Sequence, residues 1–396
     1  IRLLGEPVHT SSYGFVAPYY IRHKYDGTIT NNLAYPLTQA LYGRRIRQPI
    51  GGDFGFTGSL ALLYSHMDVW QSDIAKFGID IWMTTTALTE GFRVCQSAMG
   101  VKIHNVKDPG SDLASMFTQV TSTLFYLMGM HDVKWMGVKG STATRIFGDV
   151  RYEEPATMEI NVENLMDHFE VGYADYRELW ERVLEAANMM EVAFAAQGRK
   201  EEDFSFPEKL WAKIVYDYAV AYNFDCDVSR PALVRSMVPL YCARTADTAI
   251  RTRNMTSMEA EQLVQRQAEE FEWLKPYLVE KWLKAKAQAL QSLNWDKQRA
   301  SALVLLYRAF KLDDLKRDVT YDGELVPFDD LPIDLQYKLM QGARRAVQKF
   351  IQRAAENNRI EALEFAKFRV ERKHYLKGLD AALAHPRFTE VALALA

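Results

Sequence analysis

Short apolar runs separated by polar residues characterise the chain up to about residue 150. The aromatic and aliphatic run at residues 15–20 predicts a strand, and residues 93–103 predict a strand or a pair of strands. Residues 31–42 and 81–88 predict short helices. Strand-like and helix-like segments thus alternate in this part of the chain, which indicates an α/β fold.

Apolar residues at helical spacing become more frequent toward the C-terminus. Residues 112–130 predict a helix with an apolar stripe that consists of Leu113, Phe117, Val120, Leu124 and Leu127. From about residue 160 the pattern is helical almost throughout, as in the stripe of Tyr176, Leu179, Val183, Leu184 and Ala187. The sequence therefore predicts two domains: residues 1–155, and a mostly α-helical domain at residues 156–396.

Local signals predict where several of the C-terminal helices begin and end. Thr256 and Glu259 have the spacing of a capping box, and Pro276 predicts a kink or a split in the helix that follows. Residues 321–324 and 327–332 predict a loop between helices, and residues 335–375 predict another long helix. Four tryptophans occupy helical positions that predict burial in the core or at helix–helix contacts: Trp180, Trp211, Trp273 and Trp282.

The overall composition limits the class of protein. The formal net charge is −3, from 48 basic and 51 acidic residues, so the chain lacks the basic surface of a general nucleic-acid binder. No apolar run approaches the ~20 residues that span a bilayer, so we expect no membrane span. The three cysteines lack metal-ligand spacing and indicate the reducing cytoplasm. Because the chain opens with Ile1 in the middle of a pattern, we expect it to be a fragment.

A charged constellation follows the first predicted strand. Arg22, Asp26 and Thr30 are four residues apart, which places them on one side of a helix or of a loop that enters one. Arginine offers a planar fork of donors that suits a carboxylate or a phosphate, and the other two side chains can bond hydroxyl groups. The trio therefore fits a small hydroxy acid. On spacing alone, an ion pair that fastens a loop is the more frequent explanation.

A Gly-Gly turn provides a second candidate. Residues 47–54 predict a strand end that runs into a turn. Gly51 and Gly52 let the backbone approach a ligand closely, and the carboxylate of Asp53 can bond sugar hydroxyls. An ordinary tight turn is the structural alternative, and it is the more frequent one.

Two single residues complete the candidates. Asp80 follows Phe77-Gly-Ile, where it predicts a helix cap, a carboxylate beside a reacting carbon, or both. His104 ends an apolar run and is a candidate metal ligand, although a lone histidine is more often structural.

In order and spacing, these motifs resemble the GT-A glycosyltransferases that make compatible solutes: mannosylglycerate synthases, glucosylglycerate synthases and glucosyl-3-phosphoglycerate synthases. The stretches that carry the resemblance are Arg22-x-x-x-Asp26-x-x-x-Thr30, Gln48-Pro-Ile-Gly-Gly-Asp53, Phe77-Gly-Ile-Asp80 and Lys102-Ile-His104. The resemblance covers about residues 1–130. The family has Glu where this chain has Asp53 and Trp where it has Phe77. The family's Asp-x-Asp motif and nucleotide pocket lie just N-terminal to where this chain begins.

The resemblance implies a partial GT-A fold, the acceptor-side half of a catalytic domain, at residues 1–155. It implies a retaining, metal-dependent transferase that moves a hexose from a UDP- or GDP-sugar to glycerate. In that assignment the acceptor-binding residues are Arg22, Asp26, Gly27 and Thr30, and the donor-sugar-binding residues are Ile50, Gly51, Gly52 and Asp53. Asp80 is the catalytic residue, and His104 is a ligand of Mg²⁺ or Mn²⁺.

Alternatives to glycerate transfer stay open. Relatives that use phosphoglycerate carry Arg after the glycine of the acceptor loop, whereas Thr28 follows Gly27 here, which favours unphosphorylated glycerate. A non-catalytic helical assembly protein that keeps a decayed transferase half is the alternative from another class. In either case the apolar stripes on long helices favour a homodimer.

Overall fold

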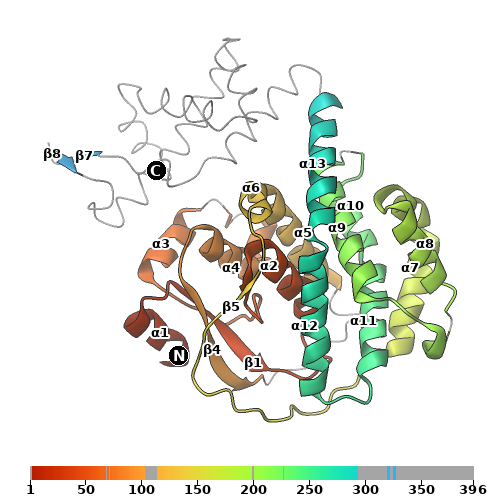
Figure 1. The fold of residues 1–396 in the computed structure, drawn as a ribbon, viewed down its shortest axis with the longest axis horizontal. Helices are drawn as coiled ribbons and strands as arrows, with labels where there is room; N and C mark the ends of the chain where they lie inside the picture. Colours follow the sequence, from red (N-terminus) through yellow and green to blue (C-terminus); the bar gives the residue numbers. More distant parts are fainter. Residues whose placement is uncertain are drawn as a thin grey trace. The chain divides into compact units, whose positions relative to one another are not determined.

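The computed structural model describes residues 2–67, 69–70, 72–102, 114–198, 200–225, 227–292, 319–321 and 324–326. The chain divides into two compact units: unit 1 comprises residues 1–57 and 69–285, and unit 2 comprises residues 58–68 and 286–396. Unit 1 combines a small mixed sheet with many helices, which confirms the predicted α/β class at that level (Figure 1). No helix among the described residues is long and apolar enough to cross a membrane.

A four-stranded sheet in the order β3-β1-β4-β6 lies in the N-terminal part of unit 1. Its strands are β1 (Phe15–Ile21), β3 (Gly55–Phe56), β4 (Val94–Val101) and β6 (Ile146–Phe147). β1 is parallel to β4 and antiparallel to β3, and β4 is parallel to β6. Both predicted strands are therefore present. Because β1 and β4 are parallel, the residues that follow them, Arg22 and Lys102, emerge at the same edge of the sheet.

β3 pairs only with Phe15 and Val16, and beyond them a turn covers the same edge of β1. The side-chain amide of Gln48 accepts a hydrogen bond from the N–H of Tyr20 at 3.2 Å and donates one to its carbonyl at 2.7 Å. Pro18 has no N–H to donate, as is typical of an edge strand. A Cβ at Gly51 would lie 2.2 Å from Cγ of Pro18, so only glycine lets the turn pack this closely. The turn predicted at residues 47–54 is thus fastened to β1.

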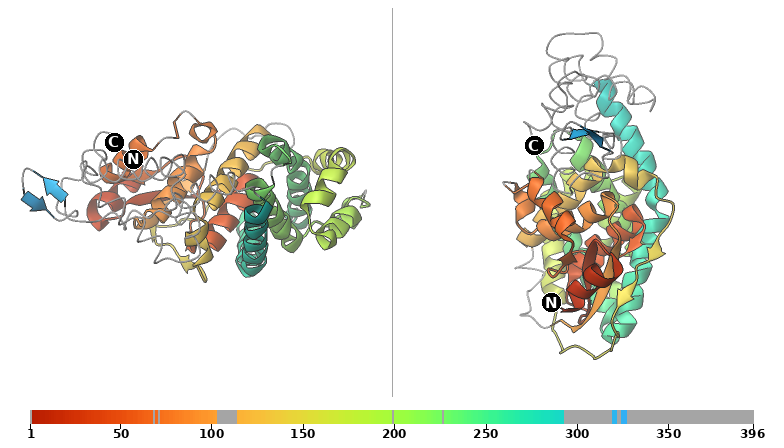
Figure 2. Two further views of the ribbon diagram at one scale, coloured as in Figure 1. Left: turned by 90° about the horizontal axis from the view of Figure 1, so that it is seen from above. Right: turned by 90° about the vertical axis from the view of Figure 1, so that its left-hand side faces the viewer.

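Helices surround the sheet and then extend away from it (Figure 2). The N-terminal helical elements of unit 1 are α1 (Arg2–Ser11), the π-helical segment η1 (Thr30–Ala34), α2 (Tyr35–Tyr42), the 3₁₀ turn η2 (Asp73–Ala75), α4 (Ile79–Thr89), α5 (Ala114–Met130) and α6 (Asp132–Met136). A separate parallel pair is formed by β2 (Arg44–Arg45) and β5 (Thr142–Ala143).

The described residues between 162 and 292 are mostly helical, as the sequence predicts. Their elements are α7 (Val162–Val183), α8 (Ala186–Ala195), the 3₁₀ turn η3 (Glu201–Asp203), α9 (Glu208–Phe224), α10 (Arg230–Ser236), α11 (Val238–Thr252), α12 (Ser257–Trp273) and α13 (Lys275–Ser292). α7 and α8 lie at the end of unit 1 away from the sheet (Figures 1 and 2).

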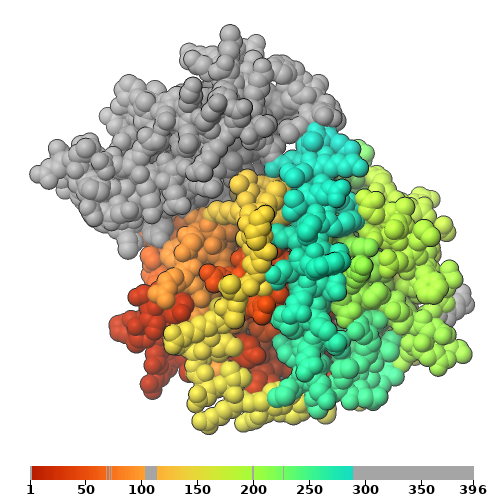
Figure 3. All heavy atoms as spheres, in the orientation of Figure 1, coloured from red at the N-terminus to blue at the C-terminus, as the bar shows by residue number. Residues whose placement is uncertain are grey.

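One hydrophobic core joins the early and late parts of unit 1. It contains Leu37 and Phe125 from the N-terminal elements together with Trp180 and Trp211 from the later helices. α12 packs along α2, and Figure 3 shows side chains of α12 against those of the N-terminal elements on that face. The predicted domain boundary after residue 155 lies inside unit 1 and stays a prediction.

The predicted helix signals have mixed outcomes. The capping box is confirmed, because Thr256 and Glu259 each accept a hydrogen bond from the other's N–H. Pro276 lies where α12 ends and α13 begins, so the predicted split is confirmed. Three of the four tryptophans are fully buried: Trp180, Trp211 and Trp282. Trp273, at the C-terminal end of α12, is 68% exposed and is therefore not a core residue, but its ring contacts another helix, since the Lys209 ammonium of α9 lies 5.7 Å from the ring centre.

The described part of unit 2 contains α3 (Gly58–His66), the end of α13 and a two-stranded hairpin. In the hairpin, β7 (Val319–Tyr321) is antiparallel to β8 (Glu324–Val326). The prediction of a loop is wrong for Tyr321 and Glu324, which lie in these strands, and the rest of the predicted loop, residues 322–323 and 327–332, lies outside the described residues. The long helix predicted at residues 335–375 lies outside the described residues.

Candidate functional site

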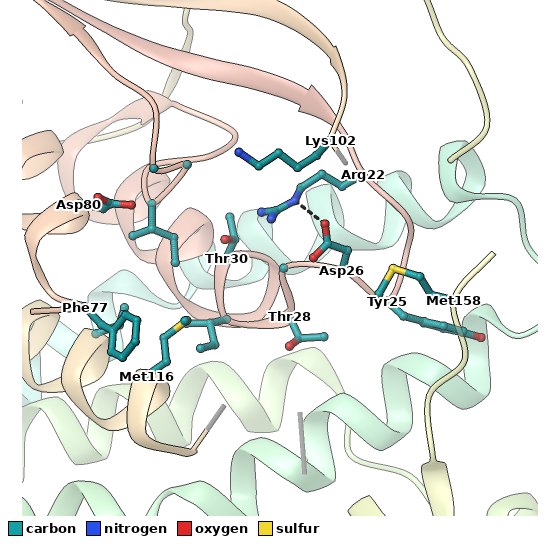
Figure 4. A pocket seen from close by; sticks show the side chains of 16 residues that line it. Arg22, Tyr25, Asp26, Thr28, Thr30, Phe77, Asp80, Lys102, Met116 and Met158 are labelled. Atoms are coloured by element: carbon teal, nitrogen blue, oxygen red, sulfur yellow. Dashed lines mark hydrogen bonds and ion pairs between the residues drawn. The ribbon is translucent and has the colours of Figure 1, made fainter. Parts of the chain in front are cut away.

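Most of the predicted site residues surround one cavity of about 430 Å³ in unit 1 (Figure 4). Those that line it are Arg22, Asp26, Gly27, Thr30, Ile50, Gly51, Gly52 and Asp80. They come from the loop after β1, from the turn on the edge of β1 and from the first turn of α4. Asp53 is not among the lining residues, and His104 lies outside the described residues.

The loop after β1 carries an ion pair into the cavity wall. Nε of Arg22 lies 2.7 Å from Oδ2 of Asp26, and the two side chains are only 14% and 10% exposed. Gly27 has a φ of +69°, and a Cβ there would lie 2.8 Å from Nη1 of Arg22, so the guanidinium lies directly over this glycine. The ion pair that fastens the loop thus consists of two side chains that the resemblance assigns to acceptor binding, and the two interpretations of the motif do not exclude each other.

Lys24 fixes the same loop to the C-terminal end of α11. Its ammonium donates to the carbonyl oxygens of Thr252, Arg253 and Met255 at 2.7, 2.9 and 2.6 Å. A cation at this end of a helix satisfies carbonyl groups that have no partner within the helix and opposes the helix dipole. The position of the loop after β1 thus depends on a helix more than 200 residues later in the chain.

Thr28 is held in place by a hydrogen bond to α11. Its Oγ1 shares a hydrogen bond of 2.5 Å with the hydroxyl of Tyr241 on α11. The ring of Tyr241 is stacked on Phe117 of α5, with centroids 4.3 Å apart. Burial raises the pKa of Tyr241, so the phenol stays protonated at neutral pH. Thr28, noted in the sequence only for the charge it lacks, is therefore a fixed part of the cavity wall.

Asp53 does not line the cavity, but it binds a residue that does. Its Oδ2 accepts hydrogen bonds from Lys102 and from the hydroxyl of Tyr20, both at 2.8 Å. The ammonium of Lys102 also lies 4.2 Å from the centre of the Tyr20 ring. The bond from Lys102 and then that from Tyr20 lower the pKa of Asp53, which stays ionised. Asp53 thereby positions Lys102, which does line the cavity.

Asp80 lies in the first turn of α4 and faces the Gly-Gly turn (Figure 4). The N-cap of α4 is Gly78 and no side chain caps the helix, so the prediction that Asp80 is the cap is wrong. The N–H of Gly52, which has a φ of +83°, donates to the Asp80 carboxylate instead. Burial raises the pKa of Asp80 to about 6 and outweighs that hydrogen bond.

The two carboxylates near the turn therefore differ in proton affinity: Asp53 is held ionised by two donors, and Asp80 is close to half-protonated near pH 6. Environments that separate the pKa values of neighbouring carboxyl groups are typical of active sites. Neither a known protein family nor a curated protein matches the sequence. The function must therefore follow from the residues around the cavity.

The described residues contain no group of three or more His, Cys, Asp or Glu side chains that could hold a metal ion. Besides Asp26, the predicted site has two carboxylates near the cavity, those of Asp53 and Asp80. The carboxylate of Asp53 already accepts a hydrogen bond from Lys102. Without His104, these groups do not make a set of metal ligands.

Several residues that line the cavity were not predicted as site residues. Tyr25, Met116, Val120 and Met158 line the cavity, although nothing in their local sequence distinguishes them from core residues. Met158 precedes α7 by only a few residues and reaches the site through tertiary packing alone. Lys102 and Phe77 also line the cavity, and both stood inside motifs that carry the family resemblance.

A second cavity of about 600 Å³ shares Arg22 with the first. It is lined by the end of β1, by the start of α12 and by residues of the neighbouring loops. Two of its charged groups bind each other, since Arg47 forms a two-pronged ion pair with Glu261; Arg47 also donates to Asn31.

Proposed function

We propose that this chain forms the acceptor side of a GT-A-type retaining glycosyltransferase, which transfers a hexose from a nucleotide sugar to glycerate. The observation that carries the proposal is the meeting of Arg22, Lys102 and Asp80 around one cavity. Two cations there suit the carboxylate of a hydroxy acid, and a carboxyl group with a pKa near neutrality suits the reacting hydroxyl.

The size of the cavity supports this proposal. A volume of about 430 Å³ is many times the roughly 10–15 Å³ that one water molecule requires. That is more room than a three-carbon acid needs, and it leaves space for a sugar ring beside the acceptor. The Gly51–Gly52 turn presents backbone without side chains to that space, so a ring can approach it closely.

In the proposed reaction, the bond between C1 of the hexose and the diphosphate oxygen breaks, and a bond between C1 and the acceptor hydroxyl oxygen forms. The nucleoside diphosphate leaves with the bonding electron pair, and its oxygen takes the proton of the acceptor hydroxyl. Arg22 holds the acceptor carboxylate, while Thr30 and Asp26 orient its hydroxyls. Asp80 orients the attacking hydroxyl or stabilises positive charge that develops on the sugar.

A divalent cation, Mg²⁺ or Mn²⁺, would stabilise charge on the leaving diphosphate. Its involvement rests on the family resemblance, and the roles of Arg22, Thr30 and Asp80 are independent of it. The cytoplasmic location and the homodimer likewise stay predictions.

The test is a transfer assay in which the protein is incubated with UDP-, GDP- and ADP-hexoses and glycerate, and mass spectrometry detects the hexosyl product. Binding of glycerate alone, measured by calorimetry, tests the acceptor site without a donor. Absence of both transfer and glycerate binding in a folded sample would count against the proposal and in favour of a non-catalytic role.

Phosphoglycerate is a second candidate acceptor, because Lys102 places another cation at the cavity besides Arg22. Its charge is largely balanced by Asp53, which favours the singly charged glycerate. A competition assay that offers both acids at equal concentration distinguishes them by the mass of the product.

A further inference from the structure

The cavity has two chemically different walls. Arg22, Asp26 and Lys102 lie on one side, and Phe77 and Met116 lie on another (Figure 4). Further apolar side chains among the described lining residues are Ile29, Ile50, Val120 and Met158. Half of the uncharged residues that line the cavity thus have apolar side chains, although the proposed acceptor, glycerate, consists of hydroxyl and carboxylate groups on a three-carbon chain.

The apolar wall is held firmly in place. Met116 and Val120 are one helical turn apart on α5, so they present one face to the cavity. The backbone N–H of Phe77 donates to the side chain of Gln119, which lies between them in the sequence, at 3.2 Å. A Cβ at Gly78 would lie 2.1 Å from Oγ1 of Thr123, so the start of α4 packs tightly against α5.

Phe77 is nevertheless 47% exposed, so its ring faces the cavity and solvent rather than the core. An aromatic ring on a cavity wall is suited to cover an apolar group of a ligand. A ligand composed only of hydroxyl and carboxylate groups would gain no hydrophobic contribution from these side chains.

We infer that the cavity also accepts hydroxy acids with an apolar substituent, an alkyl or phenyl group, and binds them more tightly than glycerate because the substituent packs on Phe77, Met116 and Val120. The carboxylate of such an acid lies toward Arg22, and its hydroxyl lies toward Asp80. The inference rests on the proposed function, since it keeps the transfer reaction and the polar groups that hold the acid, and it specifies the class of acceptor.

The expected preference is large enough to measure. Each additional buried methylene group strengthens binding by about fourfold, which corresponds to ~0.8 kcal/mol. 2-Hydroxy-4-methylpentanoate and 3-phenyllactate should therefore bind at least ~10-fold more tightly than glycerate, with lactate between them.

The experiment measures the dissociation constants of these four acids by calorimetry with the intact chain. Met116→Gln keeps the length of the side chain but makes the wall polar, and it should reduce the preference for the apolar acids about three- to tenfold. Met190→Gln is the matched control, because Met190 is 73% exposed on α8 and does not line the cavity. It should leave the preference unchanged.

Three results would overturn the inference. Glycerate that binds as tightly as the apolar acids removes the role of the wall but leaves the proposed function intact. A preference that Met116→Gln does not reduce places the apolar group elsewhere. If none of the four acids binds to a folded sample, the proposed function fails together with the inference.

Discussion

Replacing Asp80 with asparagine should stabilise the folded protein above pH 6 and leave its stability near pH 4 unchanged. Burial raises the pKa of Asp80 from 3.8 to about 6, despite the hydrogen bond from Gly52 and the favourable charge of Lys102. The folded state thus binds this proton more tightly than the unfolded state does. Stability is therefore lost as the pH rises from about 4 to about 6, because the buried carboxylate must then ionise.

The size of the effect follows from the pKa difference. A shift from 3.8 to about 6 is about two pKa units. At about 1.4 kcal/mol for each unit, the ionised carboxylate costs about 3 kcal/mol of folding free energy at pH 8. Asparagine keeps the shape of the side chain and an oxygen that can accept from Gly52, so Asp80→Asn should raise the unfolding free energy by about 2 to 3 kcal/mol at that pH.

Urea unfolding followed by tryptophan fluorescence near pH 4, 6 and 8 measures this difference. Asp203→Asn is the control, because it removes an exposed carboxylate from η3 in the same unit. A gain in stability that is the same at every pH would refute the reasoning, since it could not arise from ionisation. So would a wild-type protein that is more stable than Asp80→Asn at pH 8.

Three further predictions concern the loop and the turn. Arg22→Ala should weaken glycerate binding at least ~10-fold in calorimetry while donor binding changes little, because the lost bond is charge-assisted; equal losses for both ligands would contradict its role. Tyr241→Phe removes the hydroxyl that bonds Thr28 but keeps the ring, so the affinity for glycerate should fall several-fold, by about 1 kcal/mol. An unchanged affinity would show that this hydrogen bond does not influence ligand binding. Gly51→Ala should lower the free energy of urea unfolding by about 1 to 3 kcal/mol, because the added carbon would clash with Pro18. Gly58→Ala is the control: no atom lies within 4 Å of its added carbon, so it should change this free energy by less than about 0.5 kcal/mol.

Local signals in the sequence predicted much of the fold. β1 and β4 lie where apolar runs predicted strands, and the stripe on α5 is buried at Phe117, Val120 and Leu124. These predictions succeed because a strand or helix that packs on a core must repeat its apolar positions at a fixed period. The hairpin β7–β8 escaped notice because each of its strands has only three residues, too few for any period.

The site could be predicted only in part. The motifs around Arg22, Gly51 and Asp80 do converge on one cavity, as a shared function requires. Two features could not be read from spacing: the proton affinity of Asp80, which depends on burial among segments far apart in the sequence, and the apolar wall, in which Met116 has the same local pattern as any core residue. Both arise only when α4 and α5 pack side by side.

The bonds that fix the loop after β1 affect how quickly and how selectively the cavity binds a ligand. Besides the bonds of Lys24 and Thr28, the loop's continuation is held where Gln267 donates to the carbonyl of Asn31 and Trp211 donates to that of Asn32, at 2.7 and 2.6 Å. The conformational entropy of this segment is therefore lost when the chain folds, and no further ordering is needed when an acceptor arrives. Amide hydrogens between residues 24 and 32 should exchange slowly even in the empty protein, and acceptor association should proceed in a single kinetic phase, as expected for a rigid surface.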